Sequence, residues 1–369
     1  MKSIKRNILL NPGPATTTDR VKYAQVVPDI CPREAEFSQL LINLTEDLTR
    51  IVANLHQYTT VMFGGSGTAA IEAMISSVIS DDDQLLIIQN GAYGKRICEI
   101  AQTYQLPYLE YQSSPYDCLQ LEKLETYIQK HPRKITHLAI VHNETTTGLL
   151  NDLASVGKLC ATYQIDLLVD AMSSYAAIPI DMIQMNISYL AASSNKNIQG
   201  MPGVSFVIAS KDKLGKIRNQ PRNYYLNLIA QYDYFIKTHQ FRFTPPVQTL
   251  YALKQALDEL KQEGVETRYK RYTQSWKTLI TGLKQLQLKT LVPERYQSKI
   301  VTAVQEPCSP NYHFHDLHDY LYEKGFTIYP GKLDHLHTFR ISNIGAIYPQ
   351  DIKQFLLHLS EYLEKIDYI

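Results

Sequence analysis

Several features common in membrane, secreted and nucleic-acid-binding proteins are missing from this 369-residue chain. No run approaches the roughly 20 apolar residues that span a bilayer, and the apolar stretch within residues 1–12 is too short for a signal peptide. The 37 basic and 36 acidic side chains leave a net charge of +1, which gives no general attraction to nucleic acid or anionic membranes. Five cysteines without regular spacing fit free thiols in a reducing compartment. We therefore expect a cytoplasmic protein that binds neither nucleic acid nor membrane and takes any anion at a local site.

Apolar strand patterns alternate with helical patterns over residues 35–210. An amphipathic helix is expected over residues 40–55, and short buried strands are expected at 84–88, 108–112, 136–141, 165–169, 187–192 and 204–209. Such alternation predicts an α/β fold with a mainly parallel sheet, covered on both faces and binding its ligand at the carboxyl ends of the strands. The loop before 204–209 is too short for a helical crossover, so this strand is expected to be antiparallel.

The remaining third of the chain predicts a second, smaller domain. A chain of this length exceeds one average domain, and residues 246–285 read as a long helical stretch that leads into a smaller α+β unit. Pro349 marks the start of a final helix. Its apolar residues form one stripe that we expect to face a core: Ile352, Phe355, Leu356, Leu359, Tyr362, Leu363 and Ile366.

Lys196 directly follows the strand expected at 187–192, and Gly200, Pro202 and Gly203 break the chain just after it. A lysine at the end of a buried strand is poorly hydrated, which lowers the pKa of its ammonium. Such a lysine can act as the neutral amine that attacks a carbonyl group. The alternative is an ordinary loop lysine that points into solvent.

Asp170 ends the strand expected at 165–169, 26 residues before Lys196. An aspartate there can cap a helix or bind a metal, but no second carboxylate or histidine stands beside it at metal-ligand spacing. A buried carboxylate also keeps a pyridinium nitrogen protonated, so that the ring can accept electrons from a carbanion. Asp170 and Lys196 together point to pyridoxal phosphate.

A glycine-rich turn supplies a candidate phosphate site. Residues 64–68 read Gly-Gly-Ser-Gly-Thr and run straight into a strong helix-forming segment. Glycines admit an anion close to the backbone, Ser66 and Thr68 offer hydroxyls, and a helix N-terminus presents free N–H groups. The turn matches neither a nucleotide P-loop nor a dinucleotide fingerprint. Tyr93, just after the strand at 84–88, could stack on a flat cofactor or lie in a simple surface turn.

Nine short runs occur in one order along almost the whole chain. They are 11–14 (Asn-Pro-Gly-Pro), 64–68, 90–94 (Asn-Gly-Ala-Tyr-Gly), 142–148 (His-Asn-Glu-Thr-Thr-Thr-Gly), 169–174 (Val-Asp-Ala-Met-Ser-Ser), 194–196 (Ser-Asn-Lys), 243–246 (Phe-Thr-Pro-Pro), 329–332 (Tyr-Pro-Gly-Lys) and 339–345 (Phe-Arg-Ile-Ser-Asn-Ile-Gly). With these runs the chain resembles the class V, fold type I aminotransferases from about residue 7 to its C-terminus.

The resemblance implies an architecture, a cofactor and an activity. The fold would be a mostly parallel seven-stranded sheet with a smaller α+β C-terminal domain, divided as an N-terminal arm (1–20), a large domain (21–262) and a small domain (263–369). The protein would be a homodimer that uses pyridoxal 5′-phosphate. It would exchange an amino group between 2-aminoethylphosphonate and pyruvate by a ping-pong mechanism, in either direction.

The same resemblance implies roles for matching residues. Lys196 would bind the cofactor covalently and move the substrate proton, Asp170 would pair with the ring nitrogen, and Tyr93 would stack on the ring. Thr145 would bind the phenolic oxygen, and the phosphate would be held by Ser66, Gly67, Thr68 and Asn195, with Thr244 from a second subunit. Relatives often carry Gln at the position of Asn195 and Tyr at that of Phe241, so one phosphate contact could be replaced.

Arg340 is the expected substrate-binding residue, because a guanidinium grips carboxylates by two hydrogen bonds and also suits phosphonates. It lies on an otherwise apolar strand, which favours a site over a solvated arginine. Gly13 and Thr16 in the N-terminal turn could add donors to the same anion. Arg20 and Arg33 are weaker candidates.

Several alternatives stay open. An alanine–glyoxylate or serine–pyruvate transaminase would share this fold, a cysteine desulfurase would use a loop cysteine such as Cys308, and a non-catalytic relative would bind the cofactor only. His142 is expected to be structural. No metal is expected, because the clustered histidines of the last third of the chain lack a closing carboxylate or thiolate pattern; they are His313, His315, His318, His335 and His337.

Overall fold

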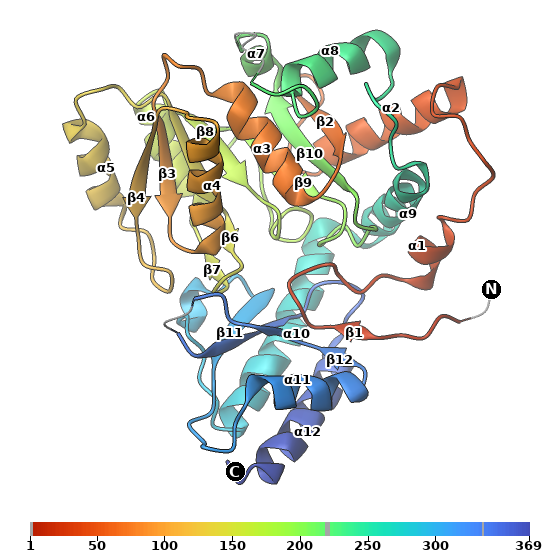
Figure 1. The fold of residues 1–369 in the computed structure, drawn as a ribbon, viewed down its shortest axis with the longest axis vertical. Helices are drawn as coiled ribbons and strands as arrows, with labels where there is room; N and C mark the ends of the chain where they lie inside the picture. Colours follow the sequence, from red (N-terminus) through yellow and green to blue (C-terminus); the bar gives the residue numbers. More distant parts are fainter. Residues whose placement is uncertain (1–2, 218–221, 334–335) are drawn as a thin grey trace.

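Seven strands form one central sheet at the core of a computed structural model that describes residues 3–217, 222–333 and 336–369 (Figure 1). In spatial order the strands are β2 (Tyr58–Gly64), β10 (Val204–Ser210), β9 (Ile187–Ser193), β8 (Asp166–Asp170), β5 (His137–Val141), β3 (Leu85–Gln89) and β4 (Tyr108–Gln112). β10 runs antiparallel to both of its neighbours, and the other pairs are parallel. The mainly parallel α/β sheet and the antiparallel last strand are confirmed.

β2 is the one strand of this sheet that the strand pattern did not predict. Two threonines break its apolar character, although all but its last residue are buried. Only β10 pairs with it, so it forms an edge of the sheet. The strand matters for function because it leads directly into the glycine-rich turn at residues 64–68.

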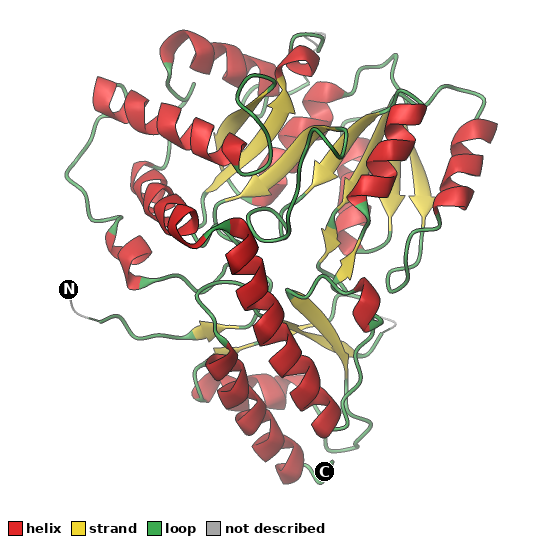
Figure 2. Cartoon of the chain, turned by 180° about the vertical axis from the view of Figure 1, so that it is seen from behind, coloured by secondary structure: helices red, strands yellow, loops and turns green. Residues whose placement is uncertain are grey.

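Helices cover both faces of the sheet, as Figure 2 shows from behind. One face carries α3 (Gly67–Val78), α4 (Ala92–Thr103) and α8 (Leu228–Thr238); the other carries α2 (Ala35–Arg50), α5 (Leu121–Lys130), α6 (Leu153–Thr162) and α9 (Val247–Glu263). In β3, Leu86 and Ile88 face the second group, while Leu85 and Ile87 face the first. This alternation is the period of two that a strand imposes on its side chains.

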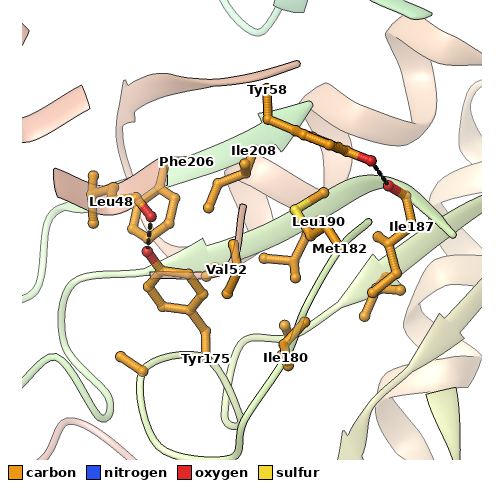
Figure 3. Packing of buried hydrophobic residues seen from close by; sticks show 14 of the residues in the cluster. Leu48, Val52, Tyr58, Tyr175, Ile180, Met182, Ile187, Leu190, Phe206 and Ile208 are labelled. Carbon is orange, nitrogen blue, oxygen red and sulfur yellow. Dashed lines mark hydrogen bonds between the residues drawn. The ribbon is translucent and has the colours of Figure 1, made fainter. Parts of the chain in front are cut away.

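Tyrosines buried in the core satisfy their hydroxyl groups with backbone carbonyls (Figure 3). Tyr175 donates to Leu48 O at 2.5 Å and packs edge-on against Phe206. Tyr58 donates to Ile187 O at 3.1 Å. An unpaired buried hydroxyl would cost about 1–3 kcal/mol, so these bonds let the two large rings pack inside the core.

Two predicted helical stretches differ from the structure. The helix expected over 40–55 begins at Ala35 and ends at Arg50, because a turn follows in which Asn54 accepts the N–H of Gln57. The stretch 246–285 is two helices, α9 and α10 (Val265–Gln285), rather than one. Gly264 separates them with φ +81°, a left-handed conformation that glycine adopts without strain.

The small domain, as we use the term, consists of α10 and the elements that follow it. These are β11 (Val301–Gln305), α11 (Phe314–Glu323), β12 (Phe326–Thr327), β13 (Tyr329–Pro330), β14 (Thr338–Ser342) and α12 (Pro349–Lys365), after a 3-10 turn, η1 (Glu294–Tyr296). β11, β14 and β13 form an antiparallel sheet, and α10, α11 and α12 enclose its core. The final helix starts at Pro349 as predicted, and its stripe is buried apart from the partly exposed Leu356.

The N-terminal arm links the two domains. Its strand β1 (Ile8–Leu9) pairs in parallel with β12 of the small domain, and the chain then passes the ends of the central strands before α1 (Asp19–Tyr23) (Figure 1). The remaining short elements are α7 (Lys211–Leu214) and the hairpin of β6 (Asn143–Glu144) and β7 (Leu149–Leu150). None of the helices in the described part of the chain is long and apolar enough to cross a membrane.

Candidate active site

A cavity of about 540 Å³ lies at the carboxyl ends of β8 and β9, beside the N-terminus of α3. Strands of a parallel sheet bring their carboxyl ends to one edge, so residues far apart in sequence meet there. Seven predicted site residues line this cavity together: Ser66, Gly67, Thr68, Tyr93, Asp170, Asn195 and Lys196.

Lys196 projects into the cavity wall from the turn after β9. Its Nζ donates a hydrogen bond to Pro12 O at 2.7 Å, and burial lowers the pKa of its ammonium. Gly13 leaves room for this arrangement, because a Cβ on that residue would lie 2.0 Å from Lys196 Nζ. The N-terminal arm therefore lies against the lysine, and a larger residue at position 13 would have to displace the end of the Lys196 side chain.

The chain around Lys196 is fixed by side chains that reach its backbone. The Asn197 amide donates to Ser173 O and Tyr175 O at 2.8 and 3.0 Å. The buried Arg268 of α10 donates to Asn197 O at 2.6 Å and is held by Glu263 at 2.7 Å. These bonds tie the turn after β9 to the turn after β8, and so couple the position of Lys196 to that of Asp170.

Asp170 ends β8 with its carboxylate buried in the cavity wall. One oxygen accepts the N–H of Met172 at 2.9 Å. Burial raises the pKa of the carboxyl to about 6, with a smaller contribution from the carboxylate of Glu144. A carboxylate held this way favours a cationic N–H partner, which would restore the charged form.

The glycine turn and α3 form one end of the cavity. Ser66 is the N-cap residue of α3, and its side chain makes no capping hydrogen bond. Gly67 lets the side chain of Met172 pack against the turn, because a Cβ there would lie 2.3 Å from Met172 Sδ and would displace it. Arg96 of α4 also lines the cavity and donates to Thr68 Oγ1 at 3.4 Å. A helix N-terminus with an adjacent guanidinium is suited to a phosphate.

Tyr93 lines the cavity between two cations. Lys332 Nζ lies 3.1 Å from its hydroxyl and 4.4 Å from its ring centroid, and the Arg96 guanidinium lies 4.9 Å from that centroid. Burial opposes ionisation of the phenol, but the charge of Lys332 and hydrogen bonds from Thr145 and Lys332 lower the pKa of Tyr93 to about 8.

Glu144 fixes the start of the helix that carries Tyr93. This fully buried carboxylate accepts the N–H groups of Gly94 and Thr146 at 3.2 and 3.1 Å and the Thr146 hydroxyl at 2.5 Å. Gly91 permits the approach, because a Cβ there would collide with the Glu144 side chain. Although burial raises the pKa of Glu144, the helix N-terminus favours its negative charge.

Arg340 comes from β14 of the small domain and is only 2% exposed. Its Nε donates to Pro330 O at 2.9 Å and its Nη1 to Thr145 O at 3.2 Å. Burial lowers the pKa of the guanidinium, and a hydrogen bond with Tyr93 opposes that shift. A guanidinium has five N–H donors, so Arg340 keeps donors for an anion beside Tyr93.

Two predicted site residues lie apart from this arrangement. Thr16 is buried, but its hydroxyl accepts the N–H of Leu9 at 2.9 Å and its backbone pairs with Gly345. Thr244 is exposed on the loop before α9. The two weaker arginine candidates make structural contacts: Arg33 donates to Phe241 O at 2.6 Å, and Arg20 lies beside Glu259.

Three residues of this region were not assigned a role from the sequence: Arg96, Glu144 and Lys332. Arg96 lies three residues after Tyr93 and so shares its face of α4, which is a signal that the sequence does contain. Lys332 falls within the Tyr-Pro-Gly-Lys run, but only the pairing of β13 with β14 brings it beside Arg340. Glu144 is recognisable only once the start of α4 is known.

No histidine among the described residues lines this cavity. His142 is buried, bonds Ser174 Oγ at 2.9 Å, and has a pKa lowered to about 3 by burial, so it is neutral. His335 falls outside the described residues. Among the residues that the structure describes, no group of three or more His, Cys, Asp or Glu side chains could hold a metal. Cys308 is a free thiol on the surface.

Comparison with known proteins defines the class of enzyme and then the family. The chain superposes on an alanine–glyoxylate aminotransferase from Nostoc sp. with a TM-score of 0.90 and 25% identity, covering 98% of this chain and 96% of that one. The architecture is that of a fold type I aminotransferase. Residues 20–336 match the aminotransferase class-V family, and the chain belongs to that family.

Relatives of known name extend over almost the whole chain. A 2-aminoethylphosphonate–pyruvate transaminase from Klebsiella pneumoniae is 39% identical over 357 residues, which is 95% of each chain. A bifunctional phosphonoacetaldehyde hydrolase/aminoethylphosphonate transaminase from Clostridioides difficile is 40% identical over 97% of this chain. The chain spans about half the length of that bifunctional protein, namely 56%.

Aminotransferases of class V use pyridoxal 5′-phosphate, and the cavity fits this group. Asp170 offers a buried carboxylate that needs a cationic partner, and Lys196 offers an amine with a lowered pKa. The start of α3 with Arg96 offers a site for the phosphate, and Tyr93 offers an aromatic face.

Proposed function

We propose that this protein transfers an amino group between 2-aminoethylphosphonate and pyruvate in a ping-pong reaction that yields phosphonoacetaldehyde and L-alanine, or runs in reverse. The observation that carries the proposal is 39% identity along almost the full length of a transaminase with these substrates. The grouping of Lys196, Asp170, Tyr93 and Arg340 supports it chemically.

The pyridoxal phosphate would be held by residues of the large domain, with Asn195 beside Lys196. Ser66, Gly67 and Thr68 would bind its phosphate through the N-terminus of α3, with Arg96 supplying a positive charge. Tyr93 would stack on the ring, and Thr145 would bind the phenolic oxygen. Asp170 would pair with the ring nitrogen; when bound, the cofactor supplies an electron sink for the carbanion formed at substrate Cα.

Lys196 would hold the cofactor and then move the proton that leaves substrate Cα. Burial favours the neutral amine, which is the form that can accept a proton. Pro12 O gives Nζ a defined position, and Gly13 shields it from solvent. The N-terminal arm therefore orients the base instead of contributing a reacting group.

Arg340 would bind the acidic group of each substrate in turn. The ping-pong scheme requires one site to accept both an amino donor and a keto acid, and a guanidinium can bind a carboxylate or a phosphonate with two hydrogen bonds. The two carbonyl groups that already bind Arg340 fix the direction of the guanidinium. Gly13, which lies against Lys196, could add a backbone donor to the same anion, whereas the hydroxyl of Thr16 already accepts the N–H of Leu9.

The active protein would be a cytoplasmic homodimer in which Thr244 reaches the phosphate of the other subunit. Thr244 is exposed next to Phe243, which stacks on Tyr225 with ring centroids 5.3 Å apart. Tyr225 in turn donates to Gly64 O, at the start of the glycine turn. Light scattering should give twice the mass of one chain, and Thr244→Ala should weaken cofactor binding without dissociating the dimer.

An alanine–glyoxylate aminotransferase is the second candidate, favoured by the fold comparison with the Nostoc enzyme. Serine–pyruvate transamination belongs to the same alternative. Side-by-side values of kcat/KM for 2-aminoethylphosphonate, alanine and serine would distinguish these activities.

The test of the proposal is a single half-reaction. Purified protein with bound cofactor is mixed with 2-aminoethylphosphonate alone, and its absorption spectrum is recorded. We expect the visible band of the bound cofactor to disappear and to return when pyruvate is added. A spectrum that responds to alanine or serine but not to the phosphonate would support the transaminase assignment and reject 2-aminoethylphosphonate as the substrate.

A further inference from the structure

Two cations of the small domain converge on one hydroxyl group of the large domain. Lys332, which follows β13, donates a hydrogen bond to the hydroxyl of Tyr93 at 3.1 Å, and Arg340 of β14 interacts electrostatically with the same phenol. Tyr329 is the sheet partner of Arg340, so the two cations lie on neighbouring strands. Arg340 was expected to bind substrate; Lys332 had no assigned role.

The local backbone holds Lys332 in this place. Gly331 donates its N–H to Thr338 O at 2.7 Å, and a Cβ on Gly331 would lie 2.4 Å from Thr338 Oγ1. The chain therefore turns tightly against β14 just before the lysine. Pro330 O accepts the hydrogen bond from Arg340 Nε, so one short segment positions both cations.

The charges around the Tyr93 hydroxyl are unbalanced. Lys332 and Arg340 both act on Lys196 electrostatically, and each opposes protonation of that lysine. The nearby carboxylates are Asp170 and Glu144, and both already accept backbone N–H groups within the large domain. Such an excess of positive charge, in a chain whose net charge is only +1, marks a receptor for an anion.

We propose that Lys332 is a second substrate-binding cation, which forms with Arg340 a two-cation receptor for the phosphonate dianion and so favours aminophosphonates over amino acids. This inference rests on the proposed function and names the residue that sets its substrate class.

The chemistry of the two anions gives the reason for two cations. Arginine satisfies a planar carboxylate with two parallel hydrogen bonds, and lysine acts as a compact point charge. A phosphonate resembles a phosphate in having three oxygens and nearly two negative charges near neutral pH. The fork of Arg340 can engage two oxygens, which leaves the third oxygen and the second charge for Lys332. A carboxylate has neither.

The test compares Lys332→Gln with Lys332→Arg and with a matched control, Lys324→Gln. Lys324 is an exposed lysine of the same domain whose ammonium also lies over a tyrosine ring, 5.6 Å from the centroid of Tyr320. We expect Lys332→Gln to lower kcat/KM for 2-aminoethylphosphonate by roughly 10- to 100-fold, the usual range for one charge-assisted hydrogen bond. The values of kcat/KM for alanine and pyruvate should change less than about threefold. Lys332→Arg should recover most of the loss, and Lys324→Gln should behave as wild type.

An equilibrium measurement separates binding from turnover. Ethylphosphonate and propionate, which lack the amine, are titrated into the wild-type and Lys332→Gln proteins with bound cofactor. Affinity for ethylphosphonate alone should fall. Equal losses for both ligands, or no loss for either, would refute a phosphonate-selective role. If wild-type protein converts alanine but not aminoethylphosphonate, the proposed function itself fails, and this is seen before any variant is made.

Discussion

The cofactor half and the substrate half of this site are built in different ways. The cofactor half lies at the carboxyl ends of neighbouring strands of one sheet, where Asp170 and Lys196 are held by hydrogen bonds between adjacent turns. The substrate half joins separate segments: Arg340 and Lys332 from the small domain meet Tyr93 and Thr145 from the large one. The first half rests mainly on the turns of one sheet, with Pro12 of the arm and Arg268 of α10 as supports, whereas the side chains of the second meet only when the two domains are packed together.

This difference separates the effects expected from substitutions. A change in the cofactor half should alter the chemistry with every substrate, because in the proposed reaction all of them use the same lysine and ring nitrogen. A change in the substrate half should discriminate between substrates according to the anion they carry. The four predictions that follow test this division.

Lys196→Ala should have the largest effect. Loss of the proton-transfer residue alone removes about 10²- to 10⁴-fold of rate, and loss of the covalent attachment adds to this. We expect kcat to fall at least about 1000-fold with both amino donors, with the visible band of the bound cofactor absent. The replacement Lys299→Ala, at a partly exposed position near Trp276, should leave both properties unchanged. Turnover by Lys196→Ala at a tenth of the wild-type rate would reject Lys196 as the base.

Arg340→Gln should reduce activity toward both substrates. It removes the guanidinium fork that we propose binds either anion, and it leaves Pro330 O and Thr145 O with weaker donors. We expect kcat/KM to fall about 100-fold for both 2-aminoethylphosphonate and pyruvate. The measurement is a pair of saturation curves, set against those of Lys332→Gln. If Arg340→Gln lowered kcat/KM for 2-aminoethylphosphonate alone, Arg340 would not be the cation that binds both anions, as proposed.

Asp170→Asn should change how the stability of the cofactor-free protein depends on pH. The folded pKa of about 6 lies above the ordinary value of 3.8, so the folded state binds this proton more tightly and loses stability as pH rises through that interval. The difference of about 2 units corresponds to roughly 3 kcal/mol of unfolding free energy. Denaturant unfolding at pH 4 and pH 8 should reveal this loss in wild type, and the neutral, isosteric variant should lose correspondingly less. An equal loss of unfolding free energy between pH 4 and pH 8 in the two proteins would argue that burial does not raise the pKa of Asp170.

Gly13→Ala should have the smallest effect, because it changes only the contact between the arm and Lys196. Gly13 has φ +139°, and the new Cβ would displace the flexible end of Lys196. We expect a loss of about 1–3 kcal/mol from backbone strain and about a tenfold drop in kcat from misplacement of the base. Gly325→Ala is the matched control, because Gly325 has φ +87° with no atom within 4 Å of an added Cβ. It should lose stability but keep its rate. A similar drop in kcat in both variants would mean that strain, and not the position of Lys196, is responsible.

Most of the large domain could be predicted because its strands are short, apolar and separated by helices. Six strands, the antiparallel β10 and the position of Lys196 and Asp170 at strand ends follow from that pattern. β2 was missed because its threonines dilute the apolar signal although the strand is buried. The break at Gly264 was missed because the apolar pattern continues across it, and a helical pattern alone does not reveal a positive φ.

The site likewise combines features that depend on neighbouring residues with contacts between residues far apart in the sequence. Hydrophobic period, glycine placement and residue type already specify a mainly parallel sheet, a glycine-rich turn before a helix, and a lysine and an aspartate at the edge of the sheet, since each of these depends on neighbouring residues. The contact of Gly13 with Lys196, the support of Tyr93 by Glu144 and the convergence of Lys332 with Arg340 depend on segments up to 239 positions apart, as between Tyr93 and Lys332. Contacts of this kind follow from the packing of the arm and of both domains, because only folding sets the distances between them.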